Sequence, residues 1–253
     1  MKRYAVVTGA SSGIGMEFAR QLAKRGYALV LTARREERLK ELKKELPTEC
    51  EIVLADLSKE EECYRLFEAV KHRKIAIFIN NAGFGDCGRF VDGSLTKELD
   101  MVRVNIEAMH ILMKLMLQKM QADNAGYILN VASSAGLLPA GPYMSTYYAT
   151  KAYVTSLTRG VAEELNEAGS KVYVGCLCPG PVDTEFNAVA NVEFALKGIR
   201  AKDCVAYALK QMACKKTVIV PTLLMKLATT SGRLIPQQMC VQMAARQQRK
   251  KIT

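Results

Sequence analysis

The stretch YAVVTGASSGIGMEFARQLAK, residues 4–24, combines a strand pattern, a glycine-rich turn and a helix pattern. Residues 4–8 are apolar and rich in β-branched side chains, as expected of a strand that is buried on both faces. Gly9, Gly13 and Gly15 permit a tight turn, a close approach of the backbone to a ligand, and close packing of helix on strand. The helix that follows would offer free N–H groups to an anion. The stretch therefore predicts a dinucleotide pyrophosphate site, with an ordinary strand-to-helix turn as the alternative.

Short apolar runs and helix-length patterns alternate along most of the chain. The strand-like runs are residues 4–8, 28–32, 51–55, 75–79, 127–131, 171–177 and 217–220. The helical patterns cover residues 13–26, 35–46, 59–73, 95–121, 147–168 and 203–213. This alternation predicts an α/β fold: a single-domain, Rossmann-type, doubly wound parallel sheet of about seven strands with helices on both faces. We expect residues 1–222 to form this domain and residues 223–253 to add a basic helical tail to it.

The composition argues against a membrane-spanning or metal-binding protein. The longest apolar run, residues 111–117, is short and is interrupted by Lys114. The first nine residues leave no room for the apolar stretch of a signal peptide, so we expect a cytoplasmic location. The eight cysteines include no CxxC pair, and only two histidines are present, so we expect no metal site.

The positive charge is concentrated near the C-terminus. Residues 204–253 contain nine Lys and Arg residues and no Asp or Glu, and thus carry +9 of the formal net charge of +11. We favour a solvated cationic tail, since no aromatic residue follows Tyr207 to anchor an interface. The alternative is an amphipathic element that makes weak contact with a membrane surface. A nucleic-acid partner is not expected.

In doubly wound sheets, ligands bind beyond the carboxyl ends of the strands. The second strand-like run is followed by Ala33, Arg34 and Arg35. An NAD-selective site generally has a carboxylate here, which Ala33 lacks, whereas arginine offers a planar cationic fork for a 2′-phosphate. We assign that role to Arg34 and expect Arg35 to begin the next helix. The cofactor is therefore predicted to be NADP(H).

The third and fourth strand-like runs also end in candidate site residues. Asp56, with Leu57 after it, would bond the adenine amino group or cap the following helix. Asn81, Ala82 and Gly83 are small, turn-prone residues that suit a strand end beside a cofactor.

The stretch STYYATKAY, residues 145–153, contains one tyrosine with a lysine at helical spacing. Tyr147 and Lys151 are four residues apart and would share one face of a helix, whereas Tyr148 has no such cation. We expect Lys151 to lower the pKa of the Tyr147 phenol from its usual value of about 10.

Several of these motifs together resemble the short-chain dehydrogenase/reductase superfamily in its short, NADP-preferring form. The resemblance covers residues 4–185. Its motifs are TGASSGIG at 8–15, NNAG at 80–83, Asn105 in VRVNI, Ser134 in NVASSAG, Tyr147 and Lys151 as YxxxK, and PG at 179–180. The resemblance implies an NADP(H) site formed by Gly9, Ser11, Ser12, Gly13, Ile14, Gly15, Arg34, Asp56, Leu57, Asn81, Ala82, Gly83, Tyr147, Lys151, Pro179, Gly180 and Thr184.

The resemblance also implies four catalytic residues. Tyr147 would act as general acid or base, and Ser134 would donate a hydrogen bond to the same substrate oxygen. Lys151 would favour the phenolate and bind the nicotinamide ribose. Asn105 would hold a water that links Lys151 to solvent, unless its amide bonds only local backbone. The family's serine lies about a dozen residues before its tyrosine, which favours Ser134, thirteen residues before Tyr147, over Ser133.

Pro179, Gly180 and Thr184 follow the sixth strand-like run. We expect a rigid turn whose backbone contacts the nicotinamide, with Thr184 as a donor to its carboxamide. A plain proline–glycine turn is the alternative.

The resemblance implies an NADP(H)-dependent oxidoreductase acting on a ketone or a secondary alcohol. The segments expected to form the outer wall of the substrate pocket are apolar, which favours a bulky substrate such as a hydroxysteroid. They include Phe84, Leu137, Leu138, Pro139, Tyr143, Met144, Phe186, Val189, Phe194 and Leu196. The alternatives are a 3-oxoacyl or 3-hydroxy acid substrate and a non-catalytic NADP-binding sensor. We expect a homo-oligomer, dimer or tetramer, packed through residues 95–121 and 147–168, although the tail puts the usual tetramer in doubt.

Overall fold

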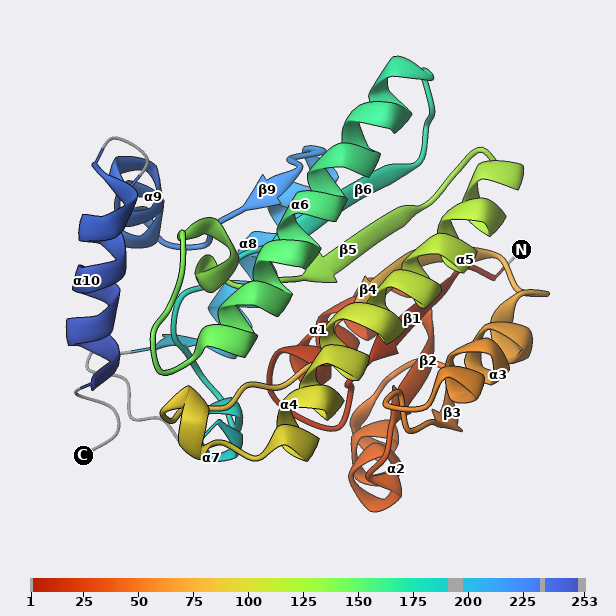
Figure 1. Ribbon diagram of the computed structural model, residues 1–253. Helices are drawn as coiled ribbons and strands as arrows, with labels where there is room; N and C mark the ends of the chain where they lie inside the picture. The colour runs from red at the N-terminus through yellow and green to blue at the C-terminus, as the bar shows by residue number, and fades with distance from the viewer. Residues whose placement is uncertain (1, 191–197, 233–234, 250–253) are drawn as a thin grey trace.

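A parallel sheet of seven strands, in the order β3-β2-β1-β4-β5-β6-β9, organises the chain (Figure 1). The computed structural model describes residues 2–190, 198–232 and 235–249. The strands are β1 (Tyr4–Thr8), β2 (Ala28–Ala33), β3 (Cys50–Leu54), β4 (Ile75–Asn80), β5 (Tyr127–Val131), β6 (Tyr173–Leu177) and β9 (Val218–Ile219). The order reverses between β1 and β4, as in a doubly wound sheet. The predicted fold class is confirmed.

Helices cover both faces of the sheet, because the strands bury side chains on both sides. In β1, Ala5 and Val7 belong to one apolar cluster and Val6 to the other, and all three are fully buried. The first cluster takes its helical side chains from α1 (Gly13–Lys24), α2 (Glu36–Glu45) and α8 (Ala201–Ala213). The second takes them from α3 (Glu60–Val70), α5 (Met109–Ala122) and α6 (Ser145–Glu167). Figure 1 shows α3, α5 and α6 on one side of the sheet.

The long helical pattern at 95–121 consists of three consecutive elements. They are α4 (Leu95–Val102), a π-helical segment (Arg103–Ala108) and α5. The methionines and leucine of α5 that face the sheet are buried within the chain: Met109, Leu112, Met113, Met116 and Met120. These side chains therefore serve the internal core and are not available to an oligomer interface.

The segment after β6 contains a small second sheet that the sequence pattern did not predict. In it, β7 (Val182–Asp183) pairs in parallel with β8 (Ile199–Arg200), and α7 (Phe186–Val189) follows β7. The tail forms α9 (Leu223–Ser231) and α10 (Gln237–Arg249), which lie together at one end of the molecule (Figure 1). The division of the chain at residue 222 stays a prediction. Within the described ranges, no helix has the length and apolar character needed to cross a lipid bilayer.

Candidate active site

A cavity of about 440 Å³ opens at the carboxyl ends of the central strands. Of the residues predicted to form the site, all but Gly15 and Asn105 line it. Those that line it are Gly9, Ser11, Ser12, Gly13, Ile14, Arg34, Asp56, Leu57, Asn81, Ala82, Gly83, Ser134, Tyr147, Lys151, Pro179, Gly180 and Thr184. The topology therefore brings together residues that are up to about 175 positions apart, because parallel strands end at the same edge of the sheet.

The glycine turn leaves space and N–H groups for an anion. Gly9 and Gly13 have φ angles of +64° and +53°, a region that favours glycine. A Cβ on Gly15 would lie 2.3 Å from the Gly9 carbonyl oxygen, so this position requires close backbone packing. The N-cap residue of α1, Ser12, makes no side-chain capping bond, and the first turn of α1 holds no acidic residue. These features fit a pyrophosphate at the start of α1.

Thr8 holds the glycine turn against the end of β4, a role that the sequence analysis missed. The Thr8 hydroxyl is fully buried and accepts hydrogen bonds from the backbone N–H groups of Asn81 (2.9 Å) and Ala82 (3.0 Å). In return, the Asn81 amide donates to the Thr8 carbonyl (2.9 Å). These bonds cross the point where the strand order reverses. A polar residue at the end of an otherwise apolar strand was the available sequence signal.

Asn105 acts on the loop after β4 and not on the cavity directly. It lies in the π-helical segment and is buried. Its Oδ1 accepts from the Phe84 N–H (3.0 Å), and its Nδ2 donates to the Phe84 carbonyl (2.9 Å) and to the Thr150 hydroxyl (3.0 Å). The alternative that its amide bonds only its own helix is wrong, because Phe84 is distant in sequence. A water relay through Asn105 stays a prediction.

Tyr147 and Lys151 lie on one face of α6, as the spacing predicted, and both are buried. The Lys151 Nζ lies 5.8 Å from the centroid of the Tyr147 ring and donates to the Val131 carbonyl (2.9 Å). Burial lowers the pKa of Lys151 to about 8. Burial also raises the pKa of Tyr147 to about 12. The expectation that Lys151 lowers the phenol pKa below its usual value is wrong for this arrangement, because desolvation of the phenolate outweighs any favourable charge.

The serine whose side chain influences the Tyr147 phenol in this structure is Ser133. A hydrogen bond from the Ser133 side chain lowers the pKa of Tyr147, against the larger effect of burial. Ser134 instead uses its backbone N–H, which donates to the Pro179 carbonyl (2.8 Å). Both serines line the cavity, so the catalytic role that spacing assigned to Ser134 stays a prediction. The spacing of thirteen residues between Ser134 and Tyr147 does not determine which of the two adjacent serine side chains points toward Tyr147.

The arginines after β2 have different environments. Arg34 is exposed at the rim of the cavity and makes no hydrogen bond or ion pair with the residues described here. Arg35 does more than begin α2, since it binds Ser11 and Glu185.

Asp56 lines the cavity and accepts from the Ser58 N–H (3.2 Å) and hydroxyl (2.9 Å), so it forms a local turn and does not cap α3.

The apolar wall of the cavity is formed partly by the expected residues. Phe84, Leu138, Met144, Phe186 and Val189 line it, whereas Leu137, Pro139 and Tyr143 do not. Phe194 and Leu196 lie outside the described residues. The Phe186 ring packs on the Tyr147 ring, with centroids 5.5 Å apart.

The tail supplies part of the wall, which the sequence analysis did not predict. Met225 of α9 and Gln247 and Gln248 of α10 line the cavity. The Gln248 amide donates to the Tyr148 phenol (2.7 Å), and Arg249 donates to the Tyr143 phenol (3.2 Å). These contacts join α10 to α6 and to the loop before it.

Comparison with known proteins agrees with this geometry. The short-chain dehydrogenase family profile matches residues 3–193. The chain belongs to this family. A mouse relative, dehydrogenase/reductase SDR family member 11, is 37% identical over 199 residues, which are 73% of this chain and 75% of the relative. Family membership makes the chain an oxidoreductase with a nicotinamide-binding fold that acts on alcohol or carbonyl groups.

Two solved structures of the family show the same fold with different cofactors. A short-chain dehydrogenase from Sphingobium yanoikuyae in complex with NADPH is 30% identical and has a TM-score of 0.82. The match covers 92% of this chain and 93% of the Sphingobium chain. A member from Burkholderia phymatum in complex with NAD is 26% identical, with a TM-score of 0.82 and coverage of 90% and 92%. The fold therefore accommodates either cofactor, and the preference depends on individual side chains.

Proposed function

We propose that this protein is an NADP(H)-dependent oxidoreductase that transfers a hydride between nicotinamide and a ketone or secondary alcohol of a bulky apolar substrate. The observation that carries the proposal is the position of the Tyr147 phenol. It lies in one cavity with the Ser133 hydroxyl, Lys151 and the glycine turn, under an apolar wall.

The residues around the phenol would divide the work as follows. Reduced nicotinamide, when bound, supplies the hydride to the carbonyl carbon. Tyr147 donates its proton to the carbonyl oxygen, and since burial raises its pKa to about 12, it keeps that proton throughout the neutral range. Ser133 donates a hydrogen bond to the same oxygen as negative charge develops on it. Lys151 holds a positive charge beneath the phenol ring. Near neutral pH the Tyr147 phenol is therefore in the protonated form that a proton donor requires.

The preference for NADP(H) rests on the residues after β2. Ala33 places no carboxylate beside the expected adenosine ribose, and Arg34 presents at the rim a guanidinium that pairs with none of the described residues. Arg35 adds a second guanidinium next to Ser11 of the glycine turn. Planar cationic forks of this kind suit a phosphate monoester.

A bulky apolar substrate, such as a hydroxysteroid, is supported by the cavity wall. Phe84, Leu138, Met144, Phe186 and Val189 face it. Among the described residues that line the cavity, the only cationic side chains are those of Arg34, Arg35 and Lys151, all in the part expected to hold cofactor. A 3-oxoacyl or 3-hydroxy acid with an anionic end is therefore less well supported.

Single substitutions test the catalytic assignment. With a panel of bulky ketones and NADPH, we expect Tyr147→Phe to lose nearly all turnover while cofactor binding, measured by fluorescence titration, is retained.

Ser133→Ala should lower kcat by about 10²–10³, since it removes one donor to the developing charge, and Ser134→Ala should change kcat by less than about fivefold. The reverse ranking of the two serines would refute the assignment of Ser133. A wild-type protein that binds NADPH but turns over no carbonyl compound would favour the non-catalytic sensor.

The cofactor assignment has its own test. We expect Arg34→Ala to weaken NADPH binding by about tenfold or more, the value of a charge-assisted hydrogen bond. NADH binding should be unchanged. A wild-type preference for NADH, measured by competitive titration, would overturn the NADP(H) assignment.

A further inference from the structure

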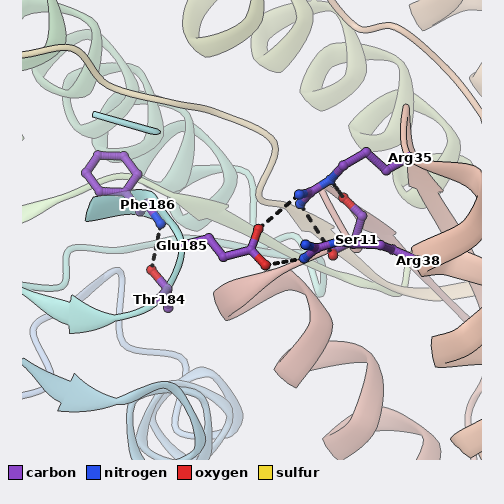
Figure 2. Close-up of polar contacts among 6 residues, drawn as sticks. All are labelled: Ser11, Arg35, Arg38, Thr184, Glu185 and Phe186. Carbon is purple, nitrogen blue, oxygen red and sulfur yellow. Dashed lines mark hydrogen bonds and ion pairs between the residues drawn. The ribbon is translucent and has the colours of Figure 1, made fainter. Parts of the chain in front are cut away.

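The Glu185 carboxylate forms ion pairs with two arginines, Arg35 and Arg38, that flank the expected phosphate site. We call Ser11, Arg35, Arg38 and Glu185 the Glu185 cluster (Figure 2). Glu185 Oε2 pairs with Nη1 of Arg35 at 2.9 Å, and Glu185 Oε1 pairs with Nη1 of Arg38. Figure 2 shows the Glu185 carboxylate between the two guanidinium groups. Arg35 also donates from Nε to the Ser11 hydroxyl (3.2 Å).

The cluster joins opposite walls of the cavity. Arg35 is the N-cap residue of α2, Arg38 lies in the first turn of α2, and Ser11 belongs to the glycine turn. Glu185 comes immediately before α7, on the substrate side. Ser11, Arg35 and Glu185 all line the cavity. The ion pairs therefore connect the wall expected to bind the adenosine end of the cofactor with the wall expected to contact substrate.

A phosphate could displace this carboxylate. The side chains of Arg35, Arg38 and Glu185 are each between 43% and 45% exposed, so a ligand can reach them. Exposed ion pairs of this kind are weak. A phosphate monoester offers more charge and one more acceptor oxygen to the same two guanidinium groups than a carboxylate does. Arg34, at the same rim, would add a third guanidinium for the phosphate.

The position of Glu185 also determines what its release would do. The Glu185 carbonyl accepts from the Val189 N–H (3.1 Å) in the first turn of α7. Thr184 Oγ1 accepts from the Phe186 N–H (3.3 Å), as Figure 2 shows. Phe186 packs on the Tyr147 ring. The Glu185 ion pairs thus help to hold α7, and with it the ring that covers the catalytic phenol.

We propose that Glu185 is a specificity-determining residue that competes with the 2′-phosphate of the cofactor for Arg35 and Arg38. When these arginines exchange Glu185 for the phosphate, α7 loses its tether to α2 and Phe186 becomes free to move from Tyr147. A cofactor without the phosphate leaves the tether in place. This inference rests on the NADP(H) preference proposed above. It adds that binding of the 2′-phosphate would also change the position of α7 and Phe186 on the substrate side of the cavity.

The test uses 2′,5′-ADP and 5′-AMP, which differ by the 2′-phosphate and have no nicotinamide to contact Tyr147. Isothermal titration calorimetry would measure both ligands with the full-length wild-type protein, Glu185→Gln and Glu45→Gln. Glu45 is a matched control, because it is an exposed carboxylate on α2 that pairs with Arg20 (2.8 Å). We expect Glu185→Gln to tighten 2′,5′-ADP binding by about five- to tenfold, as loss of its two weak exposed pairs allows. Its affinity for 5′-AMP, and both affinities of Glu45→Gln, should match the wild type.

Hydrogen exchange gives a readout that does not depend on affinity. The Val189 and Ala190 N–H groups are bonded within α7 (3.1 and 2.8 Å). We expect 2′,5′-ADP to speed their exchange in the wild type, 5′-AMP to leave it unchanged, and Glu185→Gln to show fast exchange without ligand. If the wild type binds 2′,5′-ADP no more tightly than 5′-AMP, the NADP(H) preference itself is wrong and the inference falls with it. If the preference exists but Glu185→Gln binds 2′,5′-ADP equally or more weakly, the competition alone is refuted.

Discussion

At Tyr147, burial and hydrogen bonding act on the same proton in opposite directions. Burial in the apolar cavity raises the phenol pKa to about 12, and the Ser133 side chain lowers it by a smaller amount. At the nearby Lys151, burial has the opposite effect on the pKa. It disfavours the charged ammonium and lowers the pKa to about 8. The site therefore holds a neutral phenol beside a weakened cation, which is the protonation state that carbonyl reduction requires.

The depressed pKa of Lys151 makes a prediction for stability against pH. Below about pH 8, both the folded and the unfolded chain carry the Lys151 proton, so its contribution is constant. Between pH 8 and 10.5, the folded protein has released a proton that the unfolded chain still binds, so the free energy of unfolding rises with pH. We expect the difference between wild type and Lys151→Met to shift in favour of the wild type by about 1–2 kcal/mol from pH 8 to pH 10.

Denaturant unfolding of both proteins at several pH values would measure this difference. The comparison with Lys151→Met removes the contributions of buried thiols and phenols, which act in the opposite direction over the same range. A difference that stays flat with pH would show that the Lys151 ammonium is not desolvated.

At the scale of elements, α6 and the tail together form the part of the cavity expected to hold substrate. Helix α6 presents Tyr147 and Lys151 from one face, while Tyr148 on the neighbouring face is bonded by Gln248 of α10. The buried Gln248 and the cavity-lining Met225 show that the tail contributes to the wall. The tail is therefore not a merely solvated extension over its described residues, although weak contact with a membrane surface stays a prediction.

Removal of α10 should separate substrate binding from cofactor binding. We expect a chain truncated after residue 235 to raise KM for a bulky ketone by about tenfold or more, since the part of the cavity wall formed by Gln247 and Gln248 is lost. The NADPH affinity should change less than about twofold, because the cofactor-binding candidates lie outside α10. Gln248→Ala serves as the milder companion variant and should show a smaller increase in KM. An equal loss of NADPH affinity would contradict this division of the cavity.

At the scale of the whole molecule, the described surface leaves an apolar stripe on α4. Leu95, Leu99 and Val102 are exposed and follow each other at the spacing of one helical face. The buried methionines of α5 cannot contribute to a contact between chains. If the protein forms the expected homo-oligomer through the 95–121 region, α4 is the element that provides the apolar contact.

A charge on this stripe should dissociate the oligomer. We expect the wild type to run as a dimer or larger in size-exclusion chromatography with light scattering, and Leu99→Asp to run as a monomer, since an interface core excludes unpaired charge. Leu224→Asp, on the exposed face of α9, is the control and should leave the mass unchanged. Dissociation by Leu224→Asp instead would place the interface at the tail, and a monomeric wild type would refute the oligomer.

Local sequence patterns were sufficient for the fold and for the gathering of most candidate site residues around one cavity. The strand–turn–helix unit at 4–24, the alternation of elements, and Tyr147 with Lys151 all depend on the geometry of one strand or helix, which short-range spacing determines. The placement of residues after each strand followed from the rule that parallel strands end at one edge.

Contacts between distant segments depended on the tertiary structure. The choice of Ser133 over Ser134, the anchoring of Phe84 by Asn105, the pairing of Glu185 with Arg35 and Arg38, and the closure of the cavity by α10 each join segments that no periodicity relates. The sign of the Tyr147 pKa shift also came from the packed chain, because desolvation depends on everything that surrounds the phenol and not on the lysine one turn away.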